Sequence, residues 1–192
     1  MQLVAYGAQD VYLTGNPQIT FWKVVYRRHT NFAMESIEQT FNGQVDFGRK
    51  VTCTISRNGD LIHRVYLQVT LPEVTVPTRT GDAVAGISTT SNNTENQCYF
   101  RWVNYIGHAL IRSVEVEIGG QRIDKHYGDW LNIWNELTQE PGHQVGYDNM
   151  VGNNLLLTGA GLKHVEATTL YVPLQFWFCR NPGLALPLIA LQ

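Results

Sequence analysis

Apolar and polar side chains alternate in two long stretches of this chain, LIHRVYLQVTL at 61–71 and TTLYVPLQFWF at 168–178. Because successive side chains of a β-strand point to opposite faces, a period of two predicts strands with one buried face. The residues predicted to face the core are Leu61, Val65, Leu67, Val69 and Leu71 in the first stretch and Leu170, Val172, Leu174, Phe176 and Phe178 in the second. Pro173 has the opposite parity and predicts a strand edge or a bulge.

Two more stretches show the same period beside turn residues. KVTCTIS at 50–56 is followed by Asn58-Gly59, and this dipeptide predicts a hairpin turn because both residues tolerate positive φ. SVEVEIGGQRIDK at 113–125 is the clearest hairpin, with Gly119-Gly120 as its turn. The chain is therefore predicted to contain six or seven strands.

One segment, DWLNIWNELTQEPG at 129–142, has helical spacing. Its apolar side chains recur at i, i+3, i+4 and i+7, which predicts a short helix whose core-facing stripe consists of Trp130, Ile133, Trp134 and Leu137. Asp129 is the predicted N-cap and Pro141-Gly142 the stop. The stretches 72–97 and 140–165 lack an apolar period and are predicted to be long inserted loops.

These elements together predict an all-β fold, an antiparallel sandwich of the jelly-roll kind with long loop insertions and one short helix. An immunoglobulin-like sandwich is the alternative. Residues 1–30 are expected to form an arm with a basic and aromatic segment, and residues 31–192 a single domain.

Composition indicates assembly rather than binding to nucleic acid. Only 16% of the residues are charged, so much of the surface must be covered by uncharged polar side chains or by neighbouring subunits. A net charge of -2 lacks the positive field that general nucleic-acid binding needs. Three distant cysteines without paired spacing indicate a reducing compartment, and the absence of a signal peptide indicates synthesis in the cytosol.

No residue pattern is typical of an enzyme. The six histidines show none of the spacings of local metal motifs, no serine lies in GxSxG, and TGAGLKH at 158–164 lacks the ending of a phosphate loop. Glu115 and Glu117, two residues apart beside a turn, fit a solvated strand face better than a catalytic pair. We therefore expect no catalytic residue, no metal ligand and no cofactor.

Two features could contact other molecules. Asn92 begins a glycosylation pattern, which is short and frequent by chance. The segment FWKVVYRRHTNF at 21–32 combines aromatic and basic residues, and no acidic residue lies between Asp10 and Glu35. It suits an anionic membrane or nucleic acid, or else it is a structural edge whose cations pair with a neighbouring subunit. Its candidate contact residues are Phe21, Trp22, Lys23, Arg27 and Arg28.

Three long blocks of the sequence carry a family resemblance. GAQDVYLTGNPQITFWKVVYRRHTNFAMES at 7–36, SVEVEIGGQRIDKHYGDWLNIWNELT at 113–138 and PLQFWFCRNPGLALPLIALQ at 173–192 resemble the major capsid protein of nucleocytoplasmic large DNA viruses, the group that includes phycodnaviruses, iridoviruses and mimivirus-like viruses. The resemblance implies two consecutive jelly rolls, and homotrimeric capsomers that tile an icosahedral shell over an internal membrane. This chain is too short for both jelly rolls, so it is expected to correspond to the first, without its last strand.

The resemblance also implies a role and partners. The chain is expected to be a structural capsid component, located in the virion and assembled in the host cytoplasm. Its expected partners are itself, neighbouring capsomers, minor capsid proteins and the inner membrane, with no specific nucleic acid. The basic and aromatic segment is then expected to face the particle interior. The alternatives are a carbohydrate-binding jelly-roll module and a cupin-like metalloprotein.

Overall fold

The computed structural model describes residues 29–76 and 99–191. The chain divides into two compact units, residues 1–56 and 57–192. In the described part of the first unit, the single backbone pairing is an antiparallel bridge between Asn42 and Thr52. The strand predicted over 50–56 is therefore wrong, and Asn58-Gly59 does not connect two strands of a hairpin. Alternating apolar side chains can give a segment one buried face, but a strand also requires hydrogen bonds to a partner backbone along its length.

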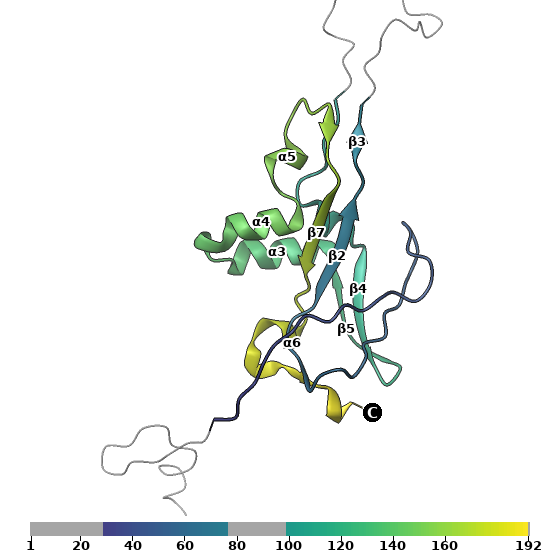
Figure 1. Cartoon of the computed structure of the whole chain (residues 1–192), viewed down its shortest axis with the longest axis vertical. Helices are drawn as coiled ribbons and strands as arrows, with labels where there is room; N and C mark the ends of the chain where they lie inside the picture. The colour runs from purple at the N-terminus through teal and green to yellow at the C-terminus, as the bar shows by residue number, and fades with distance from the viewer. Residues whose placement is uncertain (1–28, 77–98, 192) are drawn as a thin grey trace, which may run out of the picture. The chain divides into compact units, whose positions relative to one another are not determined.

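The second unit is built on a long antiparallel ribbon (Figure 1). Its central pair is β2 (Tyr66–Leu71) with β7 (Thr168–Pro173), and the pair β3 (Val74–Thr75) with β6 (His164–Val165) continues the same register. The pair β1 (Leu61–Ile62) with β8 (Leu186–Pro187) lies beyond the other end of the central pair. The two strands of the central pair are about 100 residues apart in the sequence, so the ribbon joins segments from the two ends of the unit's sequence.

Burial along the central pair confirms the predicted alternation. Leu71 of β2 is buried and Val65, Leu67 and Val69 are half-buried, whereas the intervening side chains are exposed. The second stretch is fully buried on the predicted face, which contains Leu170, Val172, Leu174, Phe176 and Phe178. Its strand ends at Pro173, as the missing N–H of proline favours, and Trp177–Arg180 form the short helix α6. Leu61 differs from the prediction because it is exposed.

The predicted glycine hairpin is confirmed as β4 (Ser113–Ile118) and β5 (Gln121–Tyr127). Gly119 and Gly120 have φ of 59° and 78°, the left-handed values that a tight two-residue turn requires. An irregularity between Val116 and Glu117 shifts the register within the hairpin. This β-bulge places Val116 opposite Asp124 and Glu117 opposite Arg122.

The described residues contain more helix than the single one predicted. The helix α3 (Gly128–Thr138) is confirmed, but Tyr127 is its N-cap and Asp129 lies in its first turn. The stretch 140–165, predicted to be a loop, contains a 3₁₀ turn at 141–143, α4 (Gln144–Val151) and α5 (Leu155–Thr158). A further short helix, α2 (Ile106–Ala109), precedes the hairpin, and 3₁₀ turns cover 182–184 and 188–190.

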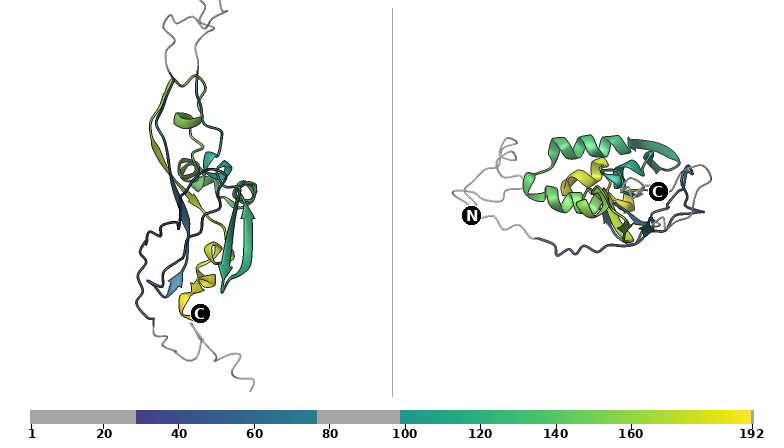
Figure 2. Two further views of the ribbon diagram at one scale, coloured as in Figure 1. Left: turned by 90° about the vertical axis from the view of Figure 1, so that its right-hand side faces the viewer. Right: turned by 90° about the horizontal axis from the view of Figure 1, so that it is seen from above.

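The core lies between the ribbon, the hairpin and the helices. Figures 1 and 2 show α3 and α4 side by side, with the ribbon and the hairpin as separate layers. One buried cluster joins the helices α3 and α4 to β7 and α6 and consists of Leu131, Tyr147, Val151, Val172, Leu174, Phe176, Phe178 and Cys179. A second buried cluster consists of Leu71, Ile106, Leu157, Val165 and Leu170.

Candidate functional site

The helix α3 buries a different face from the one its apolar spacing predicts. Its buried residues are Gly128, Leu131 and Asn135. In the predicted core stripe, Ile133 is 49% exposed and Leu137 is 75% exposed, while the two tryptophans are half-buried. The stronger apolar stripe of the helix is therefore partly available to other molecules.

The contact of Gly128 with α2 explains this rotation. A Cβ atom at this position would lie 2.2 Å from the carbonyl oxygen of His108 and 2.4 Å from that of Ile111. Real Cβ atoms do not approach backbone oxygens so closely, so this contact requires glycine. The first residue of α3 is fixed against α2, and the rest of the helix takes its rotation from that contact.

A cation and a histidine cover the half-buried tryptophans. The guanidinium of Arg180 lies 4.4 Å from the ring centre of Trp134 and 6.0 Å from that of Trp130. The imidazole of His126 lies 6.1 Å from Trp130 and stacks on Phe176 at 5.1 Å. These contacts connect α6, α3 and β5, although Arg180 itself remains exposed. Apolar spacing within α3 gives no signal for a contact with a residue 46 positions further along the chain.

His126 lies between opposing electrostatic influences. Burial lowers its pKa, the nearby Asp124 carboxylate opposes that change, and the Arg180 cation adds to it. Its Nε2 atom is 3.2 Å from a carboxylate oxygen of Asp124. The arrangement stabilises the end of β5 against α3, and among the described residues it belongs to no group of three side chains that could hold a metal ion.

A second histidine is buried beneath α4. The Nε2 atom of His108 is 2.8 Å from the hydroxyl of Tyr147, and the imidazole stacks parallel to the Tyr105 ring at 5.5 Å. Burial lowers the pKa of His108 to about 4, and burial also raises the pKa of Tyr147. Both side chains are therefore neutral at physiological pH, and their hydrogen bond joins α2 to α4.

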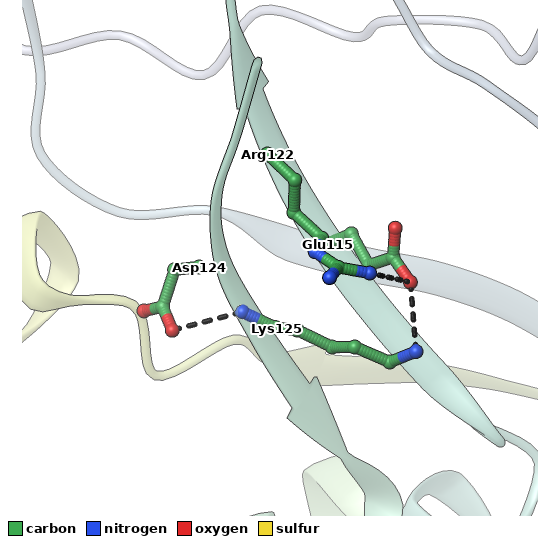
Figure 3. A network of polar contacts seen from close by, with 4 residues as sticks. All are labelled: Glu115, Arg122, Asp124 and Lys125. Carbon is green, nitrogen blue, oxygen red and sulfur yellow. Dashed lines mark hydrogen bonds and ion pairs between the residues drawn. The ribbon is translucent and has the colours of Figure 1, made fainter.

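The hairpin β4–β5 carries a small network of charges (Figure 3). Nζ of Lys125 is 3.0 Å from a carboxylate oxygen of Glu115, and the Arg122 guanidinium is 3.9 Å from the same oxygen. The Lys125 backbone N–H donates to the Asp124 carboxylate at 2.9 Å. Glu115 was predicted to lie on a solvated face, but its side chain is only 16% exposed, because the bulge and the two cations enclose it.

The structure does not describe the remaining predicted site residues. Phe21, Trp22, Lys23, Arg27, Arg28 and Asn92 all lie outside the described residues. Within 29–76 and 99–191, no three histidine, cysteine or acidic side chains are placed to hold a metal ion. In the same ranges no helix is long and apolar enough to cross a membrane.

The family match covers most of the chain. Residues 20–192 match the profile of the family described as "Major capsid protein N-terminus". The chain belongs to the major capsid protein family. It is 61% identical to the major capsid protein of Phaeocystis pouchetii virus and 63% identical to that of Pyramimonas orientalis virus, in each case over 100% of this chain. It spans only 38% and 43% of those two relatives.

The solved structures agree with this family assignment. A structure of the PBCV-1 virus capsid matches 90% of this major capsid protein chain with a TM-score of 0.61 and 41% sequence identity, and 35% of that chain is covered. The predicted antiparallel jelly-roll class is confirmed by this likeness, with more short helices than expected. The relatives are named as capsid proteins, which are structural proteins rather than enzymes, in agreement with the expected structural role.

Proposed function

We propose that this chain is the N-terminal part of a structural component of the capsid of a large DNA virus, located in the virion. The observation that carries the proposal is identity over the whole chain, 61% and 63%, to two proteins named major capsid protein. Among the described residues, His108 is hydrogen-bonded to the Tyr147 hydroxyl and His126 stacks on Phe176, contacts that fit a structural role.

Self-association into trimeric capsomers is the finer part of the proposal. The described residues leave large apolar side chains exposed on the helices, including Leu137 of α3, Val145 of α4, and Leu155 and Leu156 of α5. Exposed apolar side chains that gather in a patch are typical of protein interfaces, and we propose that these side chains contribute to such a contact. Neighbouring capsomers, minor capsid proteins and the inner membrane are proposed as further partners, with assembly in the host cytoplasm.

We also propose that residues 31–192 form a first jelly-roll domain preceded by an arm at 1–30. The family match covers the whole of the proposed domain and also the end of the arm, because it begins at residue 20 and continues to 192. The inner-face contact by Phe21, Trp22, Lys23, Arg27 and Arg28 remains a proposal from the sequence. The alternatives of a carbohydrate-binding module or a cupin-like metalloprotein have no specific observation in their favour.

The capsid role is tested by quantitative mass spectrometry of purified particles of the virus that encodes this chain. The expected result is that peptides of this chain belong to the most abundant protein of the particle. The matched comparison is infected-cell lysate before particles are purified. Depletion of these peptides during purification would contradict the proposal.

A further inference from the structure

The helices α4 and α5 cover one face of the ribbon, on the same side of β7 (Figure 1). Val151 of α4 shares a buried cluster with Val172 of β7, and Leu157 of α5 shares another with Leu170. Two positions along a helix correspond to a rotation of about 200°, so residues two before a buried one point away from the ribbon. The exposed residues on this outer side, called here the helix face, are Val145, Gly146, Asn149, Leu155 and Leu156.

The helix face is apolar and carries no charge. Val145, Leu155 and Leu156 are 72%, 82% and 80% exposed. From residue 141 to 162 the sequence contains a single aspartate, glutamate, lysine or arginine, which is Asp148. Its half-buried carboxylate accepts a hydrogen bond from the Gln144 amide at 2.8 Å. Depletion of charge around exposed aliphatic side chains is typical of the centre of a protein interface.

The outer side of the ribbon is a second uncharged surface. Its exposed residues, called here the strand face, are Tyr66, Gln68 and Thr70 of β2 with Thr169 and Tyr171 of β7. The register places Gln68 opposite Tyr171 and Thr70 opposite Thr169, so these side chains lie on one side of the ribbon. The two threonine hydroxyls are 3.1 Å apart and bond each other, which lowers the cost of burying them.

The helix face and the strand face point in opposite directions within the second unit. The helices pack on the side of β7 that carries Leu170 and Val172. Thr169 and Tyr171 alternate with these residues and point to the other side of the ribbon. Because the core lies between the two faces, they cannot contact each other within one copy. The helix face of one copy can, however, contact the strand face of another.

We propose that the helix face of one copy packs on the strand face of a neighbouring copy. The two faces match because neither carries a charge, so no unpaired ionised group is buried when they meet. Exposed aliphatic side chains on one face meet two tyrosines on the other, Tyr66 and Tyr171, which are 43% and 44% exposed. Tyrosine is enriched at interfaces. The proposal rests on the self-assembly proposed above and names one of its contacts.

The dimensions and the symmetry of this contact fit that assembly. The eight residues of α4 span about 12 Å, and the six residues of β2 span about 20 Å, so the ribbon is long enough to support the helix. A contact between two different faces is heterologous, and contacts of this kind close into rings when the rotation between copies permits. The proposed trimer is the ring with three copies.

The contact is tested by disulfide cross-linking in the full-length protein. One copy carries Val145→Cys and a second, with a different affinity tag, carries Tyr171→Cys; the two are co-expressed, purified as oligomers and oxidised with diamide. A cross-link between the two tags is expected. In the control Ile123→Cys replaces Tyr171→Cys, because Ile123 is 53% exposed on the hairpin and belongs to neither face. Unsubstituted copies measure the background from the native cysteines. An equal yield from Tyr171→Cys and Ile123→Cys would overturn the proposal.

A pair of charges tests the same contact without cross-linking. Val145→Lys should weaken self-association of the full-length protein roughly tenfold or more, because the contact would bury an unpaired cation. Adding Tyr171→Glu to the same chain should restore most of the association, since a head-to-tail contact brings the lysine of one copy to the glutamate of the next. Adding Ile123→Glu instead is the matched control and should restore none. Thermal unfolding and circular dichroism confirm that each variant is folded.

The outcomes separate this contact from the self-assembly on which it rests. If the wild type forms oligomers and Val145→Lys forms them equally well, self-assembly stands and the proposed contact is wrong. Oligomers without a cross-link between the tags would show that another part of the full-length protein covers these faces, and would also overturn the contact. A wild-type protein that remains monomeric would overturn both proposals.

Discussion

The guanidinium of Arg180 lies 4.4 Å from the centre of the Trp134 ring. This contact joins α6, which follows the ribbon strand β7, to the helix α3 that follows the hairpin. It also covers a tryptophan that the burial of α3 alone leaves partly exposed. The second unit is therefore stabilised at this point by a cation above an aromatic ring rather than by an aliphatic side chain.

Replacing Arg180 should weaken this junction modestly. Arg180→Gln is expected to lower the free energy of unfolding by roughly 0.5–1 kcal/mol, the range for a cation–π contact near the surface. Arg180→Lys is the matched control, since it keeps the charge and should lose less. Urea unfolding of the full chain, followed by tryptophan fluorescence, measures both. An unchanged midpoint in Arg180→Gln would show that the contact does not stabilise the fold.

Each tryptophan of α3 should contribute less to the free energy of unfolding than a fully buried tryptophan would. Trp134→Ala is expected to cost roughly 1–3 kcal/mol, below the 3–5 kcal/mol range of fully buried aromatic residues, because the ring is half-buried. Leu131→Ala, at a fully buried position of the same helix, provides the comparison and should cost about 2–5 kcal/mol. A larger loss for Trp134→Ala than for Leu131→Ala would contradict the observed rotation of α3.

The close approach of Gly128 to α2 gives a sharper test of that rotation. Gly128→Ala should lower the free energy of unfolding by about 1–3 kcal/mol or more, because its Cβ would overlap two backbone oxygens. Gly146→Ala in α4 is the control, since nothing lies within 4 Å of its Cβ position and alanine favours a helix by roughly 0.5–1 kcal/mol. Thermal unfolding should therefore shift in opposite directions for the two variants.

Stability should fall in mild acid because His108 is buried in its neutral form. The pKa is about 4 in the folded chain and near its ordinary value of 6.5 in the unfolded chain. Between these values the unfolded state binds more protons, so the free energy of unfolding decreases as the pH falls from 6.5 to 4 and levels off below. His126, whose pKa is also lowered, acts in the same direction.

The contribution of His108 can be measured by difference. Partial solvent screening limits its share of the acid loss to roughly 2–3 kcal/mol. His108→Gln removes the titrating group, so its unfolding free energy should change less between pH 7 and pH 4 than that of the wild type. Equal slopes for wild type and His108→Gln would show that the buried imidazole does not titrate as inferred.

The strands of the ribbon were predicted well from the sequence, because the alternation of apolar and polar side chains that marks a strand lies within the strand itself. Leu170, Val172 and Leu174 alternate with side chains on the other face, and that alternation is a property of the strand itself. The Gly119-Gly120 turn was predictable for the same reason, since its positive φ values depend on these two residues. Which strands pair was not predictable, because β2 and β7 are about 100 residues apart.

The predictions for α3 and α4 failed because tertiary contacts determine which face of α3 is buried and whether α4 is helical. The face of α3 is set by the approach of Gly128 to two carbonyls of the segment at 108–111, and apolar spacing favoured the tryptophans instead. The helix α4 has little apolar periodicity and contains Gly146, so its helicity depends on packing of Tyr147 and Val151 into the core. Of the candidate site, the apolar spacing of α3 was readable from the sequence, but the exposure of Ile133 and Leu137 was not.

Self-assembly into trimers is tested most directly by the molar mass of the protein in solution, measured by light scattering after size-exclusion chromatography over a range of micromolar concentrations. We expect a stable species with three times the mass of the polypeptide. A protein that remains monomeric at every concentration would contradict it.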